Sequence, residues 1–172
     1  MQFLRPILLL CAGFLLLPAA GNDVFNGSFE RSGRPDGWEW STFGGGDAAC
    51  AVIRSGGNRH LRIAYRSLQQ PNRYGQLLQN VPLTPGRIYR LSWKMWGKPA
   101  RNICWTLGKH WKLRPALPPV TPEAARHTLR FRAEPDEFDG KLYPVRLICE
   151  NLTPELNLDD IEITEEELPA ES

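Results

Sequence analysis

The chain has 172 residues, of which 21 are lysine or arginine and 19 are aspartate or glutamate, and its formal net charge is +2. This near-neutral balance gives no support for nucleic-acid binding, which relies on an excess of basic side chains. The length suits one domain with a real core and is too short for two.

The first 21 residues have the pattern of a secretory signal peptide. Arg5 gives a positive start, residues 7–17 form an apolar run, and residues 18–21 are small or turn-forming. The run falls short of the roughly 20 residues that span a bilayer, so we expect cleavage after Gly21 rather than a retained anchor. Cys11 is not predicted to be lipidated, because Leu10 before it is too large for that signal. The sequence therefore predicts secretion to an extracellular or periplasmic space, with no membrane attachment after cleavage.

Three cysteines, Cys50, Cys104 and Cys149, remain after this cleavage. In an oxidising compartment either one pair forms a disulfide or all three stay as buried thiols, and the sequence selects neither the outcome nor the pair. Their wide separation speaks against a zinc site, which needs closely spaced cysteine pairs.

Short segments rich in β-branched and aromatic residues are interrupted by fifteen prolines and fifteen glycines, and helical periodicity is nearly absent. We predict an all-β antiparallel β-sandwich of about eight to ten strands over residues 22–164, followed by a frayed acidic tail, residues 165–172. Residues 56–58 and the Pro85-Gly86 turn join neighbouring strands, and residues 112–125 form a loop. In chain order, the clearest predicted strands cover residues 49–54, 61–67, 74–83, 88–96, 102–111, 127–134, 143–151 and 156–164.

Four landmarks then follow one another along the chain: "NGSFE" at 26–30, "PDGWEW" at 35–40, "QNVPLTPGRIYRLSWKMWGK" at 79–98 and "LNLDDIEI" at 156–163. In this order the chain resembles the carbohydrate-binding modules of the family 4/9 type, which are galactose-binding-domain-like jelly rolls. The resemblance covers residues 22–164, and the order and spacing of the landmarks carry it more than any single motif. It implies a jelly-roll fold and binding of a polysaccharide or glycan.

The resemblance also implies a structural calcium ion where the first and last strands meet. Glu30 would supply one carboxylate, and Asp159 or Asp160 the other. Ca²⁺ prefers six to eight oxygen ligands, so carboxylates and backbone carbonyls suit it. Alternation along a strand points the two aspartates to opposite faces, which favours a single ligand, Asp159. The alternative is that these carboxylates are solvated strand ends, or that Glu30 pairs with an arginine.

Six tryptophans supply candidate platforms for sugar rings, which stack their C–H faces on flat aromatic surfaces. Trp96 falls on the polar face of residues 88–96, with Lys94, and Trp111 ends its segment beside charged residues; both are predicted platforms. The structural alternative, which is the commoner role of tryptophan in a sandwich, applies to the others. Trp93 and Trp105 share faces with apolar residues and are predicted to be core, Trp38 is predicted to be structural, and Trp40 is left undecided.

Outward positions of neighbouring predicted strands supply groups that would hydrogen-bond sugar hydroxyls. We predict one outer face that holds Trp96 and the polar side chains, suited to an oligosaccharide and in particular to an acidic one. The alternative is an ordinary solvated sheet face, where charged residues are the default. The predicted polar ligand-binding residues are Lys94, Arg130, Arg132, Arg146, Glu150 and Gln76, and Tyr74 and Gln79 are weaker candidates.

Motifs for catalysis are missing from the sequence. There is no Gly-x-Ser-x-Gly elbow and no Gly-rich phosphate loop, and His60, His110 and His127 are scattered without metal-ligand spacing. The predicted function is therefore a secreted, non-catalytic carbohydrate-binding module. A protein-interaction or adhesion module is the first alternative, and a small glycoside hydrolase with two carboxylates across a cleft is the second.

Overall fold

The structure is a computed structural model that describes residues 23–44, 47–67, 73–98, 103–150 and 155–167. The predicted signal peptide lies outside these residues. The described part is built from strands and one short 3-10 turn, η1 (Pro135–Glu137). The strands are β1 (Glu39–Phe43), β2 (Asp47–Ser55), β3 (Asn58–Ser67), β4 (Tyr74–Val81), β5 (Ile88–Gly97), β6 (Ile103–Leu107), β7 (Ala125–Arg132), β8 (Tyr143–Glu150) and β9 (Glu155–Glu166).

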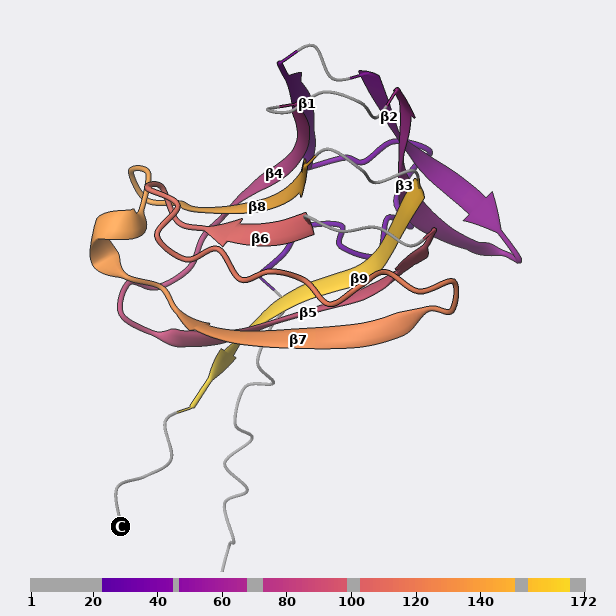
Figure 1. Cartoon of the computed structure of the whole chain (residues 1–172). Helices are drawn as coiled ribbons and strands as arrows, with labels where there is room; N and C mark the ends of the chain where they lie inside the picture. Colours follow the sequence, from indigo (N-terminus) through magenta and orange to yellow (C-terminus); the bar gives the residue numbers. More distant parts are fainter. Residues whose placement is uncertain (1–22, 45–46, 68–72, 99–102, 151–154, 168–172) are drawn as a thin grey trace, which may run out of the picture.

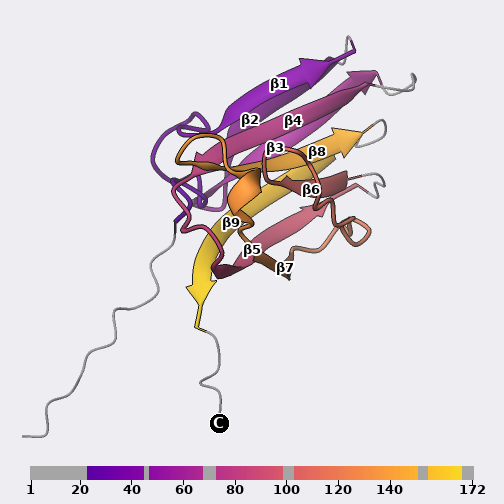
Figure 2. The same cartoon turned by 90° about the vertical axis from the view of Figure 1, so that its left-hand side faces the viewer.

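These strands form two antiparallel sheets that pack face to face. Sheet A has four strands in the order β1-β4-β8-β6, and sheet B has five in the order β2-β3-β9-β5-β7. Figure 1 shows β8 and β6 lying over β5, β9 and β7, and Figure 2 shows the strands of sheet A following one another in their sheet order. The predicted all-β sandwich of the jelly-roll type is confirmed. None of the described residues forms a helix long and apolar enough to cross a membrane.

The space between the sheets is filled by side chains that alternate along the strands, as a half-buried strand requires. In β5, Leu91, Trp93 and Met95 are each no more than 3% exposed, whereas Lys94 and Trp96 on the opposite face are only half-buried. Trp105 of β6 is fully buried and meets Trp93 edge to face, with ring centroids 5.5 Å apart. The prediction that Trp93 and Trp105 belong to the core is confirmed.

The first described residues lie along β9, so the beginning and the end of the domain are neighbours, as the resemblance implied. The Ile161 N–H donates to the carbonyl oxygen of Gly27 at 3.0 Å. A Cβ on Gly27 would lie 1.8 Å from the Ile161 carbonyl oxygen, which explains the glycine. Residues 25–28 form a turn. Phe29 and Trp38 pack together behind this turn, 6.2 Å apart, which confirms the structural role predicted for Trp38.

Strand β9 departs from its predicted form in two ways. It continues to Glu166, so the first two residues of the predicted tail belong to sheet B, where Glu165 pairs with Arg87 and Glu166 with Arg90. It also contains an irregularity at Asp160, whose φ of 47° is in the left-handed region. An extra residue of this kind in one strand changes which of the following side chains face the core.

Candidate functional site

The predicted ligand-binding residues lie on opposite sides of the sandwich. Lys94 and Trp96 of β5 and Arg130 of β7 occupy the outer face of sheet B, whereas Arg146 of β8 and Gln76 of β4 occupy the outer face of sheet A. Arg132, in register with Ile88, is on the sheet B side as well. The prediction of one shared face is wrong because β8 pairs with β4 and β6 rather than with β7. Alternation within β5, β7 and β8 was assigned correctly, but it does not reveal which sheet a strand joins.

The outer face of sheet B is an array of ion pairs. The Lys94 Nζ lies 2.6 Å from an Asp160 oxygen, and Arg130 Nε lies 2.7 Å from a Glu166 oxygen. Arg126 approaches the same Asp160 carboxylate at 3.2 Å. The Trp96 ring contacts the His60 ring, with centroids 4.9 Å apart. Lys94 and Arg130, two of the cations predicted to bind a ligand here, are engaged by the carboxylates of β9, as in an ordinary charged sheet surface.

The outer face of sheet A has a different character, because aromatic and uncharged groups are placed along it. Phe43 of β1 stacks on Tyr74 of β4 with ring centroids 4.7 Å apart and an 18° interplanar angle, and Phe43 is 40% exposed. Gln76 and Ile148 are neighbours in register in the middle of this face and are almost completely buried. We call the outer surface made by Phe43, Tyr74, Gln76, Arg146 and Trp111 the sheet A face.

Trp111 reaches this face from the loop that follows β6. Its φ is 61°, a left-handed conformation that a bulky side chain adopts only when its surroundings impose it. Here the buried Glu137, which is 2% exposed, holds the loop in this conformation. Its carboxylate accepts the His110 N–H at 2.7 Å, and its carbonyl oxygen accepts the Lys109 N–H at 2.7 Å. A Glu137 oxygen also lies 3.3 Å from the Lys112 Nζ, so the residues on both sides of Trp111 are held.

Two arginines flank the Trp111 ring. The guanidinium carbons of Arg114 and Arg146 are each 5.6 Å from its ring centroid, within the range of cation–π attraction. Arg146 also donates to the Gly108 carbonyl oxygen at 2.7 Å, and burial lowers the pKa of its guanidinium. Within the described part of the chain, no carboxylate lies within ion-pair distance of Arg146. Arg114 was missed from the sequence, because its proline-rich surroundings predict only a loop.

The remaining polar candidates have structural roles or fall outside the described atoms. Gln79 points into the molecule, where its amide bonds the backbone of Phe25 and Gly37, so it is not on the sheet A face. Trp40, left undecided above, is half-buried and packs on the core. Glu150 ends β8, but its side chain lies outside the described part.

The three predicted calcium ligands each have protein partners. Glu30 accepts the Arg59 N–H at 2.6 Å, and Asp159 accepts the Asn58 side-chain amide at 2.8 Å. The Asp160 carboxylate contacts the Lys94 ammonium, so it lies on the outer side of sheet B. Asp159 is the residue opposite Lys94 in register, so its side chain points to the same side. The expectation that the two aspartates face opposite sides is therefore wrong, and the φ of Asp160 is the reason. Cations beside Asp160 do not suit a calcium site, and no cluster of three or more metal-binding side chains occurs among the described residues.

The cysteines are free thiols in the structure. Cys149 is fully buried, and Cys50 and Cys104 are half-buried. Burial raises the pKa of Cys50 to about 12 and also raises the pKa of Cys149, so these thiols are poor nucleophiles.

Comparison with protein families and with curated proteins finds no match. Solved structures do match, at low sequence identity. A CBM4 module is 17% identical and aligns over 83% of this chain and 99% of its own, with a TM-score of 0.61. TmCBM61, solved with β-1,4-galactotriose, is 16% identical over 86% of this chain and 100% of its own, with a TM-score of 0.60.

The fold also occurs in proteins with other activities. A Stig cyclase from Fischerella sp. TAU, solved with an indole compound, is 14% identical over 86% of this chain and 98% of its own, with a TM-score of 0.65. The chain spans 21% of the active domain of the bacteriophage CBA120 tailspike protein 4, at 11% identity and a TM-score of 0.64. At these identities the matches establish the jelly-roll fold that several carbohydrate-binding modules share, and they do not single out the 4/9 type.

Proposed function

We propose that this chain is a non-catalytic glycan-binding module and that it binds its ligand on the sheet A face. The observation that carries the proposal is Trp111, a half-buried ring held at positive φ between two arginines. Holding a tryptophan in a strained conformation has an energetic cost, and such strain concentrates at ligand-binding sites. The carbohydrate-binding modules among the structural neighbours support the ligand class.

The chemistry of the sheet A face fits a sugar chain. The Trp111 indole offers a flat surface to the C–H groups of a pyranose ring, and the Phe43–Tyr74 stack offers a second aromatic group. Between them, the Gln76 amide supplies both donors and an acceptor for hydroxyl groups. Arg146 has no ion-pair partner in the described residues, and a guanidinium can donate two parallel hydrogen bonds to a carboxylate. This favours an acidic glycan over a neutral one.

The two carboxylates that contact the residues beside Trp111 are engaged with protein groups, which supports a non-catalytic role. Glu137 is buried beneath the loop and holds His110 and Lys112, and Asp136 hydrogen-bonds the Lys112 ammonium. A glycoside hydrolase needs two carboxyl groups that face the substrate across a cleft. Secretion remains a proposal; N-terminal sequencing of the protein exported by its host tests cleavage after Gly21.

The experiment compares two tryptophans on opposite faces. Purified native protein, Trp111→Ala and Trp96→Ala are applied to an array of neutral and acidic glycans, and affinities for the best ligand are measured by calorimetry. We expect Trp111→Ala to lose about 1–3 kcal/mol of binding free energy, the range of a stacking contact in a binding site, and Trp96→Ala to bind like the native protein.

Other outcomes of this comparison contradict the proposal. Loss of binding in Trp96→Ala alone would move the site to sheet B. Absence of binding across the whole array would favour the protein-interaction alternative. Thermal unfolding of both variants separates loss of binding from loss of folding.

A further inference from the structure

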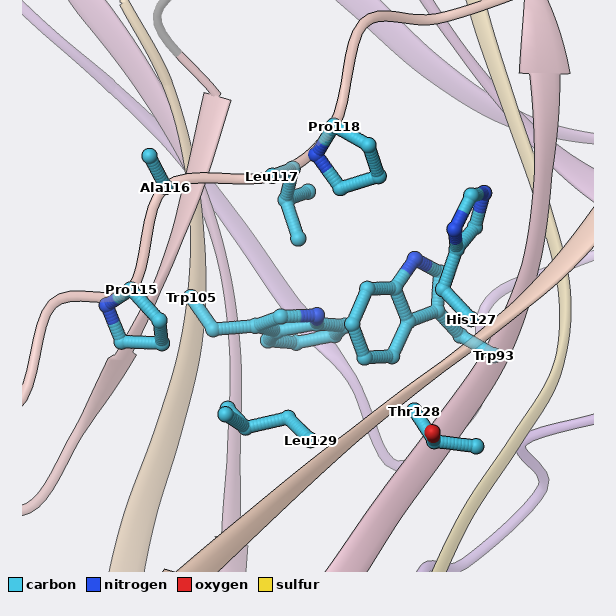
Figure 3. Close-up of a pocket in the computed structure, with 9 residues that line it drawn as sticks. All are labelled: Trp93, Trp105, Pro115, Ala116, Leu117, Pro118, His127, Thr128 and Leu129. Carbon is cyan, nitrogen blue, oxygen red and sulfur yellow. The ribbon is translucent and has the colours of Figure 1, made fainter.

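A cavity of about 150 Å³ lies at the side of the sandwich, between β6 of sheet A and the β5–β7 pair of sheet B (Figure 3). Trp105 and Trp93 form its inner wall, Leu129 and His127 of β7 contribute a second wall, and the segment 115–118 borders it on the remaining side. A protein cavity of about this volume has room for one small ring compound such as benzene. The cavity is separate from the aromatic groups assigned to glycan binding.

The inner wall carries hydrogen-bond donors that have no protein acceptor. Trp93 is 3% exposed and Trp105 is fully buried, and neither indole N–H has a hydrogen-bond partner. In Figure 3 the Trp105 nitrogen is on the ring edge nearest to Trp93, whereas the Trp93 nitrogen is on the edge toward Leu117, Pro118 and His127. The Trp105 N–H therefore faces the Trp93 ring, whereas the Trp93 N–H lies beside the His127 ring and toward Leu117 and Pro118. A buried donor without an acceptor is unfavourable, so an acceptor placed there gains more than it would on the surface.

The rest of the lining defines the chemical class of the guest. No Asp, Glu, Lys or Arg lines the cavity, so a charged guest would lose its hydration without gaining a partner. Leu117, Leu129 and the Trp105 ring are apolar surfaces that suit a flat hydrocarbon ring. His127, whose ring stacks on Trp93 at 5.6 Å, adds one more polar edge beside the Trp93 nitrogen.

We propose that this cavity is a binding site for a small neutral ring compound that carries one hydrogen-bond acceptor, such as an aromatic ketone. The acceptor oxygen receives the Trp93 indole N–H, and the ring packs between Trp105 and Leu129. The segment 115–118 that borders the cavity is held to sheet A by the Leu117 N–H, which donates to the Ile103 carbonyl oxygen at 3.0 Å. The site is independent of the glycan-binding proposal, and either one stands if the other fails.

The test uses two probes of matched shape on the native protein. Acetophenone carries a carbonyl acceptor, and ethylbenzene carries none. The indole N–H signals of the six tryptophans are followed by ¹⁵N NMR during titration, with assignment by single Trp→Phe substitutions. We expect acetophenone to move the Trp93 signal and to bind about tenfold more tightly than ethylbenzene, because only its oxygen satisfies the donor.

Trp38 supplies the matched control. Its indole N–H is also buried and unpartnered, but Trp38 does not line the cavity, so its signal should stay unchanged. Trp93→Phe should bind acetophenone and ethylbenzene with about equal affinity, while Trp38→Phe should keep the preference for acetophenone. Equal binding of the two probes to the native protein overturns the hydrogen-bonding role of Trp93. If neither probe moves the Trp93 or Trp105 signal at millimolar concentration, the cavity holds only water and the proposal is overturned. The comparison of probes on native protein remains decisive if Trp93→Phe does not fold.

Discussion

At the scale of single residues, the sheet A face depends on groups that never touch it. Glu137 is buried beneath the loop, yet it fixes the backbone of His110 and Lys109 and thereby the conformation of Trp111. Gly108 belongs to the same arrangement, since its φ is 88° and a Cβ there would lie 2.5 Å from a Glu137 oxygen. A buried carboxylate such as that of Glu137 stabilises the loop only while its hydrogen-bond donors remain in place.

Gly108→Ala therefore tests how the loop is held. A left-handed alanine costs about 1–2 kcal/mol, and the clash with Glu137 adds roughly 1–3 kcal/mol as overpacking does in a core. Gly86→Ala is the matched control, because Gly86 has a φ of 80° but open space around its Cβ position. Urea unfolding should show a larger loss for Gly108→Ala, and calorimetry should show weaker glycan binding in that variant only. Equal losses of stability in the two variants would mean that the Glu137 side chain moves away from the added methyl group at no energetic cost.

His60 provides a pH-dependent prediction at the same scale. Burial lowers its pKa below the ordinary value, and Arg62 adds to the shift, although Asp159 and Glu155 oppose it. The unfolded chain then binds a proton more readily than the folded one, so stability is present above about pH 6.5 and falls as the pH drops below it. The melting temperature should decrease between pH 7.5 and 5.5. His60→Gln should flatten this decrease, and an unchanged slope would contradict the assignment.

At the scale of elements, alternation predicted the strands well but could not assign them to sheets. The faces of β5, β7 and β8 follow from their sequences, and Trp93 and Trp105 are core as expected. Whether Arg146 and Arg130 share a face depends on pairing between distant strands, which a single sequence does not encode locally. Trp111 was predicted to be an accessible ring and is half-buried in the structure. The residue that holds its loop could not be predicted, because Glu137 lies 26 positions further along the chain.

The end of β9 gives a prediction about metal binding. Because Glu30, Asp159 and Asp160 already contact Arg59, Asn58 and Lys94, we expect the melting temperature to be the same in calcium and in a chelator. Glu30→Gln should cost about 0–1 kcal/mol, because the exposed carboxylate accepts a backbone N–H and glutamine keeps an acceptor oxygen there. A clear decrease of the melting temperature in chelator would support the structural calcium ion that the resemblance implied.

At the scale of the whole molecule, the outer faces of the two sheets differ in chemical character. The outer face of sheet B joins β9 to β5 and β7 through ion pairs such as Lys94–Asp160 and Arg130–Glu166. The sheet A face presents aromatic rings and an arginine without a carboxylate partner among the described residues. The core between the sheets contains buried apolar side chains contributed by both of them. The molecule is therefore expected to hold together without a covalent link between the sheets.

The cysteines test this expectation. Cys50 belongs to sheet B and Cys149 to sheet A, both pack with the core, and the raised pKa of each keeps the thiol protonated at neutral pH. All the cysteines of the purified domain, Cys50, Cys104 and Cys149, should be titratable with a thiol reagent after denaturation, and the native protein should react slowly. The melting temperature should not change with a reducing agent. Detection of a single thiol, together with a lower melting temperature on reduction, would instead show that a disulfide contributes to stability, as an oxidising compartment permits.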